Sequence, residues 1–259
     1  MTVSYRLEDG VAVLALNDLP RHNALSRAMI AELNRLHARS IEDGARAIVL
    51  GADGPSFCAG ANIDDLRSGW MEGGDVDTDP LQFFRRLATD PRVTIAAVQG
   101  IAAGGGLELT LACDLVVAGE RACFLAPELG HGVVPPLGIA LLPQIVGRHR
   151  AMDLVLTRRK VGAEEAASIG LATHRTEADD VMSSAVTLAR SIVGKIPPGA
   201  LGVAKQLLGR HQPLDWHSIL TCSSEVPAAE WREGLDAFMQ KRRPDYDQFW
   251  AKSDKGDQA

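Results

Sequence analysis

Two glutamates in apolar, small-residue surroundings are the best candidates for chemistry in this chain. Glu108 comes directly after the glycine-rich run Val98–Leu107, and Glu128 follows the apolar run Ala122–Leu125. Most glutamates are simply surface carboxylates. Two carboxylates that converge on one apolar site, however, take different pKa values, so that one serves as an acid and the other as a base.

A glycine-rich turn before Glu108 is a candidate for binding negative charge. At Gly104-Gly105-Gly106 a predicted strand passes into a predicted helix. The first N–H groups of a helix have no partner within it and lie at the positive end of its dipole. One such donor on a developing oxyanion contributes about 3 kcal/mol in known enzymes. The alternative is a turn needed only for close packing. A second small-residue run, Ser56–Ile63, follows another strand pattern and a Gly-Pro turn.

The familiar motifs of other reaction classes are missing from the sequence. It holds no G-x-S-x-G, no G-x-x-x-x-G-K-[ST], no H-E-x-x-H and no G-x-G-x-x-G after the first strand. The seven histidines are scattered, and the four cysteines have neither C-x-x-C nor Cys/His ligand spacing. We therefore expect no metal site, no nucleophile–histidine catalysis, and solitary thiols in a reducing compartment.

The overall composition narrows the class of protein. A length of 259 residues suits one large domain with at most a small appendage, and 46% hydrophobic residues are typical of a globular chain. The net charge of −6 argues against nucleic acid or an anionic membrane as the main partner. The apolar runs are too short to span a bilayer, and no signal-peptide pattern opens the chain. We expect a soluble, cytoplasmic protein.

The pattern of elements predicts an α/β first part and a helical last part. Strand patterns at 3–7 and 11–16 flank a hairpin turn at Glu8-Asp9-Gly10, and Ser26 is placed to cap a helix that ends near Gly44. Further strands are expected at 47–50, 93–98, 115–118 and 122–125. No strand is expected after these. Continuous apolar strands indicate a sheet that is covered on both faces. Helices are then expected at 140–146, 151–156, 163–169, 179–193, 199–208 and about 215–240.

Two segments admit more than one interpretation. The Gly- and Asp-rich run Gly69–Pro80 predicts a mobile acidic loop, either a solvated insertion or a lid over a site. The last predicted helix is thinly apolar and ends in the basic run Gln240–Pro244. Such a helix either packs on a neighbouring subunit or ends in solvent with cations that suit its dipole.

Several short motifs occur together in one order and spacing. They are Pro20 with Asn23–Ser26, Phe57–Ala61, Gly104–Glu108 with Cys113-Asp114, Pro127-Glu128, Ala167–Leu171, and the tail from Glu233-Gly234 through Phe238 to Lys241–Pro244. On these residues the sequence resembles the enoyl-CoA hydratase/isomerase family, the crotonase superfamily, over essentially its whole length. Each motif alone is weak, but their joint order is specific.

The resemblance implies a fold, an assembly and a substrate class. Members fold as a spiral of ββα units followed by a C-terminal helical trimerisation region, and they form trimers or dimers of trimers. In this chain the spiral core would span 1–195 and the helical region 196–259. Members bind acyl-CoA thioesters and hold the thioester carbonyl between two backbone N–H groups, which by position are those of Ala61 and Gly105. Such a pair stabilises an enolate without a metal.

The resemblance also implies a reaction. In the hydratase branch two glutamates hold the water that adds across the 2,3 double bond, and both positions are occupied here. We expect Glu108 to act as base and Glu128 as acid in fatty-acid or related acyl-CoA breakdown, although a coupled pair does not always permit a one-residue assignment. The alternatives are an isomerase, in which the glutamate at 128 alone shuttles a proton, another acyl-CoA lyase, and a non-catalytic acyl-CoA binder.

The residues expected at the substrate follow from the same resemblance. No separate cofactor is implied, because coenzyme A is part of the substrate. The residues implied at the CoA part and the rest of the site are Arg21, Ala24, Ala59, Gly60, Asn62, Ile63, Gly104, Pro136, Phe238 and Lys241, the last two reaching CoA in a neighbouring subunit. The walls of the acyl pocket are expected from Leu66–Leu87 and from the last helices.

The sequence departs from the family pattern around Pro136, where Leu137 and Ile139 are also bulkier than usual, and at Asn62. Pro136 replaces a glycine whose N–H helps to orient the catalytic water, and proline has no N–H. Either another donor holds the water, such as His131 or a neighbouring amide, or the protein does not hydrate ordinary enoyl-CoA efficiently. Asn62 stands where aspartate is usual, which is a milder change.

Overall fold

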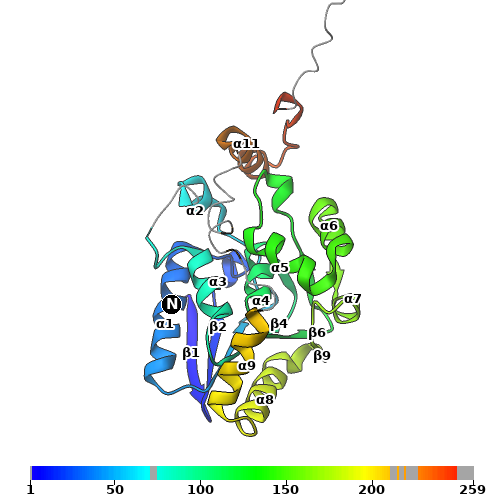
Figure 1. Cartoon of the computed structure of the whole chain (residues 1–259). Coiled ribbons are helices and arrows are strands. Elements are labelled where there is room, and N and C mark those ends of the chain that lie inside the picture. Colours follow the sequence, from blue (N-terminus) through cyan, green and yellow to red (C-terminus); the bar gives the residue numbers. More distant parts are fainter. Residues whose placement is uncertain (1, 71–74, 211–214, 216–218, 220–226, 250–259) are drawn as a thin grey trace, which may run out of the picture.

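The apolar strands form one central sheet, which is shown in the computed structural model of Figure 1. The structure describes residues 2–70, 75–210, 215, 219 and 227–249. The strands are β1 (Val3–Glu8), β2 (Val11–Leu16), β3 (Ala47–Ala52), β4 (Val93–Val98), β5 (Ile101–Ala103), β6 (Leu115–Gly119), β7 (Cys123–Leu125), β8 (Val161–Gly162) and β9 (His174–Thr176).

Helices surround this sheet and extend beyond one end of it (Figure 1). They are α1 (Arg27–Glu42), α2 (Ile63–Arg67), α3 (Pro80–Ala88), α4 (Gly105–Leu111), α5 (Pro136–Val146), α6 (Arg148–Thr157), α7 (Ala163–Ser168), α8 (Val181–Val193), α9 (Pro198–Arg210) and α11 (Ala228–Met239). Among the residues that the structure describes, no helix is both long enough and apolar enough to cross a bilayer.

The main sheet has the strand order β1-β2-β3-β4-β6-β9. The predicted hairpin is confirmed: β1 pairs antiparallel with β2, and Asp9 and Gly10 both have positive φ, as a turn matched to the strand twist requires. All other pairings in this sheet are parallel. Strands β2, β3 and β4 are buried at every position, because helices cover both faces of the sheet.

A second, smaller layer forms where the chain leaves the central strands of the main sheet. It contains the three-stranded sheet β5-β7-β8, and two single bridges extend it, Cys58 to Ala102 and Leu25 to Ala61. The segments that follow β2, β3, β4 and β6 therefore lie side by side. Each turn of the chain contributes one strand to the first layer and one segment to the second, which makes the fold a spiral.

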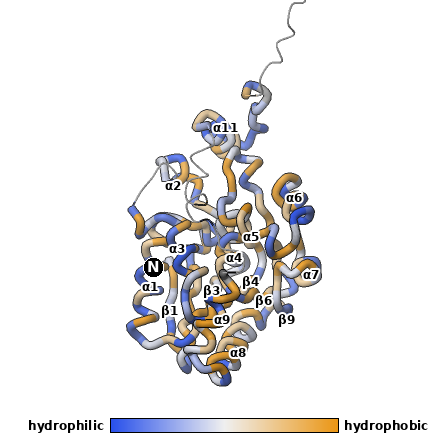
Figure 2. Tube along the Cα trace, viewed as in Figure 1, coloured by the Kyte–Doolittle hydropathy of each residue, from blue (hydrophilic) through white to orange (hydrophobic). Residues whose placement is uncertain are grey.

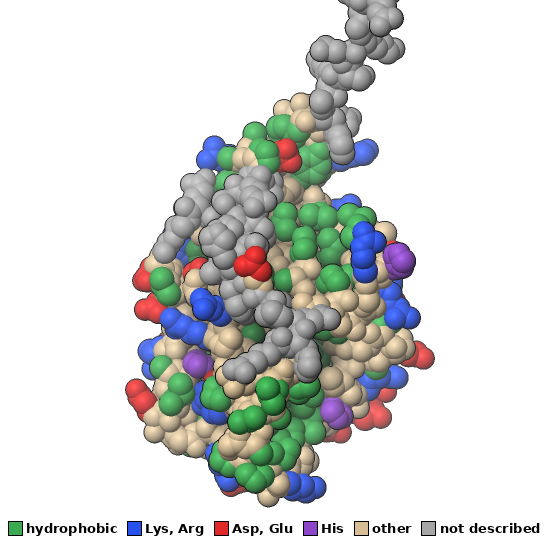
Figure 3. All heavy atoms as spheres, viewed as in Figure 1, with side chains coloured by type: hydrophobic (Ala, Val, Ile, Leu, Met, Phe, Trp, Pro, Cys, Tyr) green, Lys and Arg blue, Asp and Glu red, His purple; other side chains and the backbone are tan. Residues whose placement is uncertain are grey.

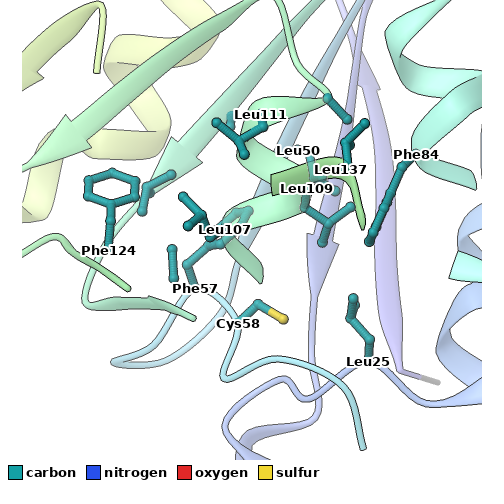
Figure 4. Close-up of a cluster of buried hydrophobic side chains, with 14 of the residues drawn as sticks. Leu25, Leu50, Phe57, Cys58, Phe84, Leu107, Leu109, Leu111, Phe124 and Leu137 are labelled. Atoms are coloured by element: carbon teal, nitrogen blue, oxygen red, sulfur yellow. The ribbon is translucent and has the colours of Figure 1, made fainter. Parts of the chain in front are cut away.

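Two apolar clusters flank the main sheet. On one face α8 packs against β3 and β4 through Val181, Ala185 and Ala189. On the other face lies the larger cluster, which includes α1, α3 and α4. Figure 4 shows its centre, where Leu107 and Leu109 of α4 lie among side chains of several other segments. The central strands are accordingly hydrophobic, and polar residues concentrate at the periphery (Figure 2).

The last part of the chain differs from the prediction. Strands do not stop after β7, because β8 and β9 complete the two sheets. Helix α5 begins at Pro136 rather than at Ala140, which suits proline because the first position of a helix needs no N–H partner. Helices α2 and α3 were not predicted. The expected helix over 215–240 is described only at its end, as α11, and much of the rest lies outside the described residues.

Candidate active site

The segments of the second layer open onto one cavity of about 620 Å³. Its floor comes from the ends of the spiral turns, and its walls come from the α2–α3 region and from α11. The lining residues on which the site depends are Ala59–Ile63, Gly104, Gly105, Glu108, Glu128, His131, Pro136 and, in the walls, Leu66, Trp70, Leu81, Phe84, Leu235, Phe238 and Met239.

Two backbone N–H groups in the cavity floor have no acceptor among the described residues. They belong to Ala61 and Gly105, whereas the neighbouring amide of Asn62 donates to the Leu25 carbonyl over 2.6 Å. The two segments are in close contact, since an ideal Cβ on Gly105 would lie 3.8 Å from the Ala61 nitrogen. Two unpaired amides at one polar point of an apolar cavity are suited to a negatively charged oxygen.

The three glycines before Glu108 have different structural roles. Gly104 has a φ of +53° and makes the turn into α4. Gly106 permits close packing, because a Cβ there would collide with the Cys58 carbonyl oxygen. Gly105 contributes the N–H without an acceptor described above. An N–H without an acceptor and a close packing contact therefore occur at adjacent residues of this segment.

Glu108 lies on the first turns of α4 with only 6% of its surface exposed. Its Oε1 accepts hydrogen bonds from the N–H groups of Leu137 and Gly138, at 2.7 and 3.0 Å. These are the first N–H groups of α5, since Pro136 has none. Burial raises the pKa of Glu108 well above its usual range, and the two amide donors oppose that rise.

Glu128 opens a 3₁₀ helix, η3 (Glu128–His131), that follows β7. Its Oε2 is buried with no hydrogen-bond partner among the described residues, and its Oε1 would lie 2.9 Å from a Cβ placed on Gly104. Burial raises the pKa of Glu128, and the charge of Glu108 raises it further. Because two amides of α5 stabilise the charge of Glu108, while that charge disfavours ionisation of Glu128, Glu108 is the residue of the pair that ionises more easily.

The walls of the cavity come from the two regions that the sequence predicted, Leu66–Leu87 and a late helix. Trp70 is held there by a hydrogen bond from its Nε1 to the Thr78 carbonyl at 2.9 Å. Asp79 caps α3 and lines the same wall, and burial raises its pKa. Part of Gly69–Pro80 is therefore cavity wall rather than a purely solvated insertion; residues 71–74 lie outside the described residues.

The residues expected at CoA differ in their exposure and in their hydrogen bonds. Arg21, Ala24, Asn62 and Ile63 line the cavity, as do the others of that group up to Pro136. The Arg21 side chain is 61% exposed, and it pairs weakly with Asp18 at 3.5 Å. Asn62 Oδ1 caps α2 by accepting from the Asp64 and Asp65 amides.

The two C-terminal residues, expected at the CoA of a neighbouring subunit, occupy different positions in their own chain. Phe238 lines the cavity of its own chain, because α11 packs over η3 and α2. The sequence pattern could not indicate this, since it does not fix where a terminal helix docks. Lys241 is exposed and is not part of the cavity wall.

Sequence reasoning missed the individual wall residues and the Glu108–α5 hydrogen bonds. Trp70, Phe84 and Leu235 belong to no motif, so only their place in the fold identifies them. Among the described residues, no three His, Cys, Asp or Glu side chains gather closely enough to hold a metal ion.

Comparison with known proteins places this arrangement in a family. A "putative enoyl-CoA hydratase" of Thermus thermophilus is 40% identical over 156 residues, which are 58% of this chain and 62% of the relative. An "enoyl-CoA isomerase/hydratase" of Zymoseptoria tritici is 37% identical over 58% of this chain and 52% of its own length. The chain spans about 60% of the length of the curated relatives it matches.

The agreement extends to the fold and to nearly the whole sequence. A crystal structure of an enoyl-CoA hydratase/isomerase from Pseudoalteromonas atlantica superposes with a TM-score of 0.85 at 30% identity, covering 95% of this chain and 99% of the other. The expected α/β spiral with C-terminal helices is thereby confirmed. The family model for enoyl-CoA hydratase/isomerase matches residues 6–249. The chain belongs to the enoyl-CoA hydratase/isomerase family.

Proposed function

We propose that this protein is an enoyl-CoA hydratase, which adds water across the 2,3 double bond of a 2-enoyl-CoA thioester. One observation carries the proposal: the buried Glu108, Glu128 with one buried carboxyl oxygen, and two unpaired backbone N–H groups line the same apolar cavity. An isolated carboxylate would suffice for moving one proton. A pair that divides into one ionised and one protonated member is suited to adding both parts of a water molecule.

The proposed mechanism assigns one task to each group. The amides of Ala61 and Gly105 hold the thioester oxygen, which gains negative charge when water attacks C3. Glu108, whose charge the α5 amides stabilise, takes a proton from the water as its oxygen bonds to C3. Glu128, kept protonated by burial and by its charged neighbour, delivers a proton to C2. Coenzyme A enters as part of the substrate, and no separate cofactor takes part.

Partner and assembly belong to the same proposal. We place the CoA phosphates near Arg21 at the open end of the cavity, and the acyl group against Trp70, Phe84 and Leu235. A homotrimer or dimer of trimers in the cytoplasm follows from the family resemblance. Exposed apolar side chains on α5, α6 and α9 support such an assembly, among them Ile139, Leu156 and Leu208.

An isomerase is the second candidate, and the start of α5 favours it. Pro136 offers no N–H, and the amides of Leu137 and Gly138 already bind Glu108. No amide among these three residues is therefore free to hold a water molecule. An isomerase, or another lyase, needs no such water, and an acyl-CoA binder would need no proton transfer at all.

The discriminating experiment is hydration of crotonyl-CoA in H₂¹⁸O, followed by mass spectrometry of the product. We expect turnover with one ¹⁸O in the product, and a fall in kcat of about 10²–10⁴-fold in both Glu108→Gln and Glu128→Gln. The exposed residue Glu164 provides the matched control, Glu164→Gln, which should keep full activity. Turnover of a 3-enoyl-CoA without ¹⁸O, lost only in Glu128→Gln, would select the isomerase. Binding without turnover would select the binder.

A further inference from the structure

His131 stands one turn after Glu128 on the same short helix, η3. A 3₁₀ helix has three residues per turn and rises about 2 Å per residue, so side chains three residues apart lie on one face about 6 Å apart. Both residues line the cavity. One oxygen atom that is hydrogen-bonded on both sides at about 2.8 Å bridges a gap of this size.

The imidazole of His131 has unused hydrogen-bonding capacity. Its ring nitrogens have no hydrogen-bond partner among the described residues, and its one ring contact is edge-on with Phe238 at 5.1 Å between centroids. The residue is half-buried, and burial, with a smaller contribution from the charge of Arg158, lowers its pKa. It is therefore neutral at pH 7 and offers one donor and one acceptor.

The rest of the wall around Glu128 offers few comparable donors. Pro136 has no N–H, and the two amides that follow it in α5 are bound to Glu108. The indole N–H of Trp70 is bound to Thr78. Pro127, Val133 and Val134 contribute no polar side chain. Among the described polar side chains that line the cavity and have an unused donor, that of His131 is therefore the nearest to Glu128 in sequence.

We infer that His131 donates a hydrogen bond to the oxygen that becomes bonded to C3, first as water and then as the 3-hydroxyl of the product. This inference rests on the proposed hydratase function. In the step, the water oxygen bonds to C3, one water proton passes to Glu108, and the protonated Glu128 carboxyl supplies the hydrogen at C2 as the double bond breaks. His131 keeps its proton throughout, and the pair of carboxyls regains its starting state by exchange with solvent.

Ligand binding tests the contact without turnover. We would measure the Kd values of butyryl-CoA and 3-hydroxybutyryl-CoA by calorimetry and divide the first by the second. Any general loss of affinity cancels in this ratio. His131→Phe preserves an aromatic contact with Phe238 but has no N–H, and it should lower the ratio about 5–10-fold. His131→Gln restores a donor and should stay within about 3-fold of the wild type. His149→Gln, at an exposed histidine outside the cavity wall, should change nothing.

The outcomes separate this inference from the proposed function. If His131→Phe weakens both ligands equally, the side chain only packs in the wall and the inference is wrong. His131→Leu repeats the test should the phenylalanine variant fail to fold. In hydration of crotonyl-CoA we expect kcat to fall about 10–100-fold in His131→Phe with little change in KM, and His131→Gln to recover most of it. If the wild type hydrates no 2-enoyl-CoA, the proposed function is wrong. The ratio of the two Kd values still decides whether His131 donates a hydrogen bond to the 3-hydroxyl.

Discussion

At the residue scale, the position of Glu128 imposes a cost that depends on pH. One of its oxygens is buried without a hydrogen-bond partner among the described residues, and its neighbour Glu108 bears the competing charge. The pKa of Glu128 is raised in the folded protein. The neutral carboxyl therefore stabilises the folded protein fully at a pH below the pKa that Glu128 has in the unfolded chain. This stabilisation is lost as the pH rises through the pKa that Glu128 has in the folded protein.

We predict that Glu128→Gln raises the thermal stability of the protein, and raises it more at pH 8 than at pH 5. The amide cannot ionise, so the variant escapes the cost that the wild type meets as the pH rises. A gain of about 1 kcal/mol corresponds to about 2–4 °C in Tm for a chain of this size. Calorimetric melting curves at both pH values check this, with Glu164→Gln as the exposed control. A Tm difference that is equal at both pH values would contradict the raised pKa.

At the element scale, the contact between α4 and the Cys58 segment sets the spacing of the two unpaired amides. Ala61 lies three residues after Cys58, and Gly105 begins α4. Gly106 faces Cys58 so closely that an ideal Cβ would lie 2.8 Å from the Cβ of that residue and would also collide with its carbonyl oxygen. The backbone carbonyl cannot rotate away as a side chain can, so an added methyl group must push the two segments apart.

We predict that Gly106→Ala lowers kcat/KM for crotonyl-CoA by at least about 10²-fold and lowers stability by about 1–3 kcal/mol, because overpacking shifts the backbone. Gly199→Ala, in α9 where a Cβ would meet no described atom within 4 Å, is the matched control and should be close to neutral. Steady-state kinetics and denaturant unfolding measure the two effects. Full activity in Gly106→Ala would show that the separation of the two amides does not control the reaction.

The elements also show what a sequence can predict. The buried strands β2, β3 and β4 and the Ser26 cap of α1, which accepts from Met29 N–H at 3.2 Å, follow from local patterns. Strand β9 does not, because it is short, polar and largely exposed, and it forms through pairing with β6. The two glutamates were found from their surroundings and the family motifs. The binding of Glu108 by the α5 amides depends on how distant segments pack, which no local pattern records.

At the scale of the whole molecule, several of the exposed apolar side chains among the described residues lie on α5, α6 and α9. One group is on α5 and α6, with Ile139, Met152 and Leu156, and another is on α9, with Val203 and Leu208. Figure 3 shows hydrophobic side chains gathered over these parts of one face. Leu208 is 74% exposed. Exposed apolar side chains that gather on one face are typical of a surface that binds another protein.

We predict that the protein is a homotrimer or dimer of trimers in solution, and that Leu208→Asp shifts it toward smaller species. A carboxylate in an apolar interface loses its hydration without gaining a partner, which costs several kcal/mol. Size-exclusion chromatography with light scattering measures the mass. Leu19→Asp, at an exposed leucine near the start of the chain, is the control and should leave the mass unchanged. A wild-type monomer at micromolar concentration would contradict the proposed assembly.

The two-layer spiral has a consequence for how such a molecule diversifies. The amides of Ala61 and Gly105 come from different turns, which the bridge between Cys58 and Ala102 ties together. Trp70, Phe84 and Leu235, by contrast, stand on an excursion between turns and on a terminal helix. Under the proposed function, a change in that excursion or that helix would alter which acyl group fits the cavity without moving the amides. Selectivity and reactivity would then depend on separate stretches of the chain, so that one can change while the other is kept.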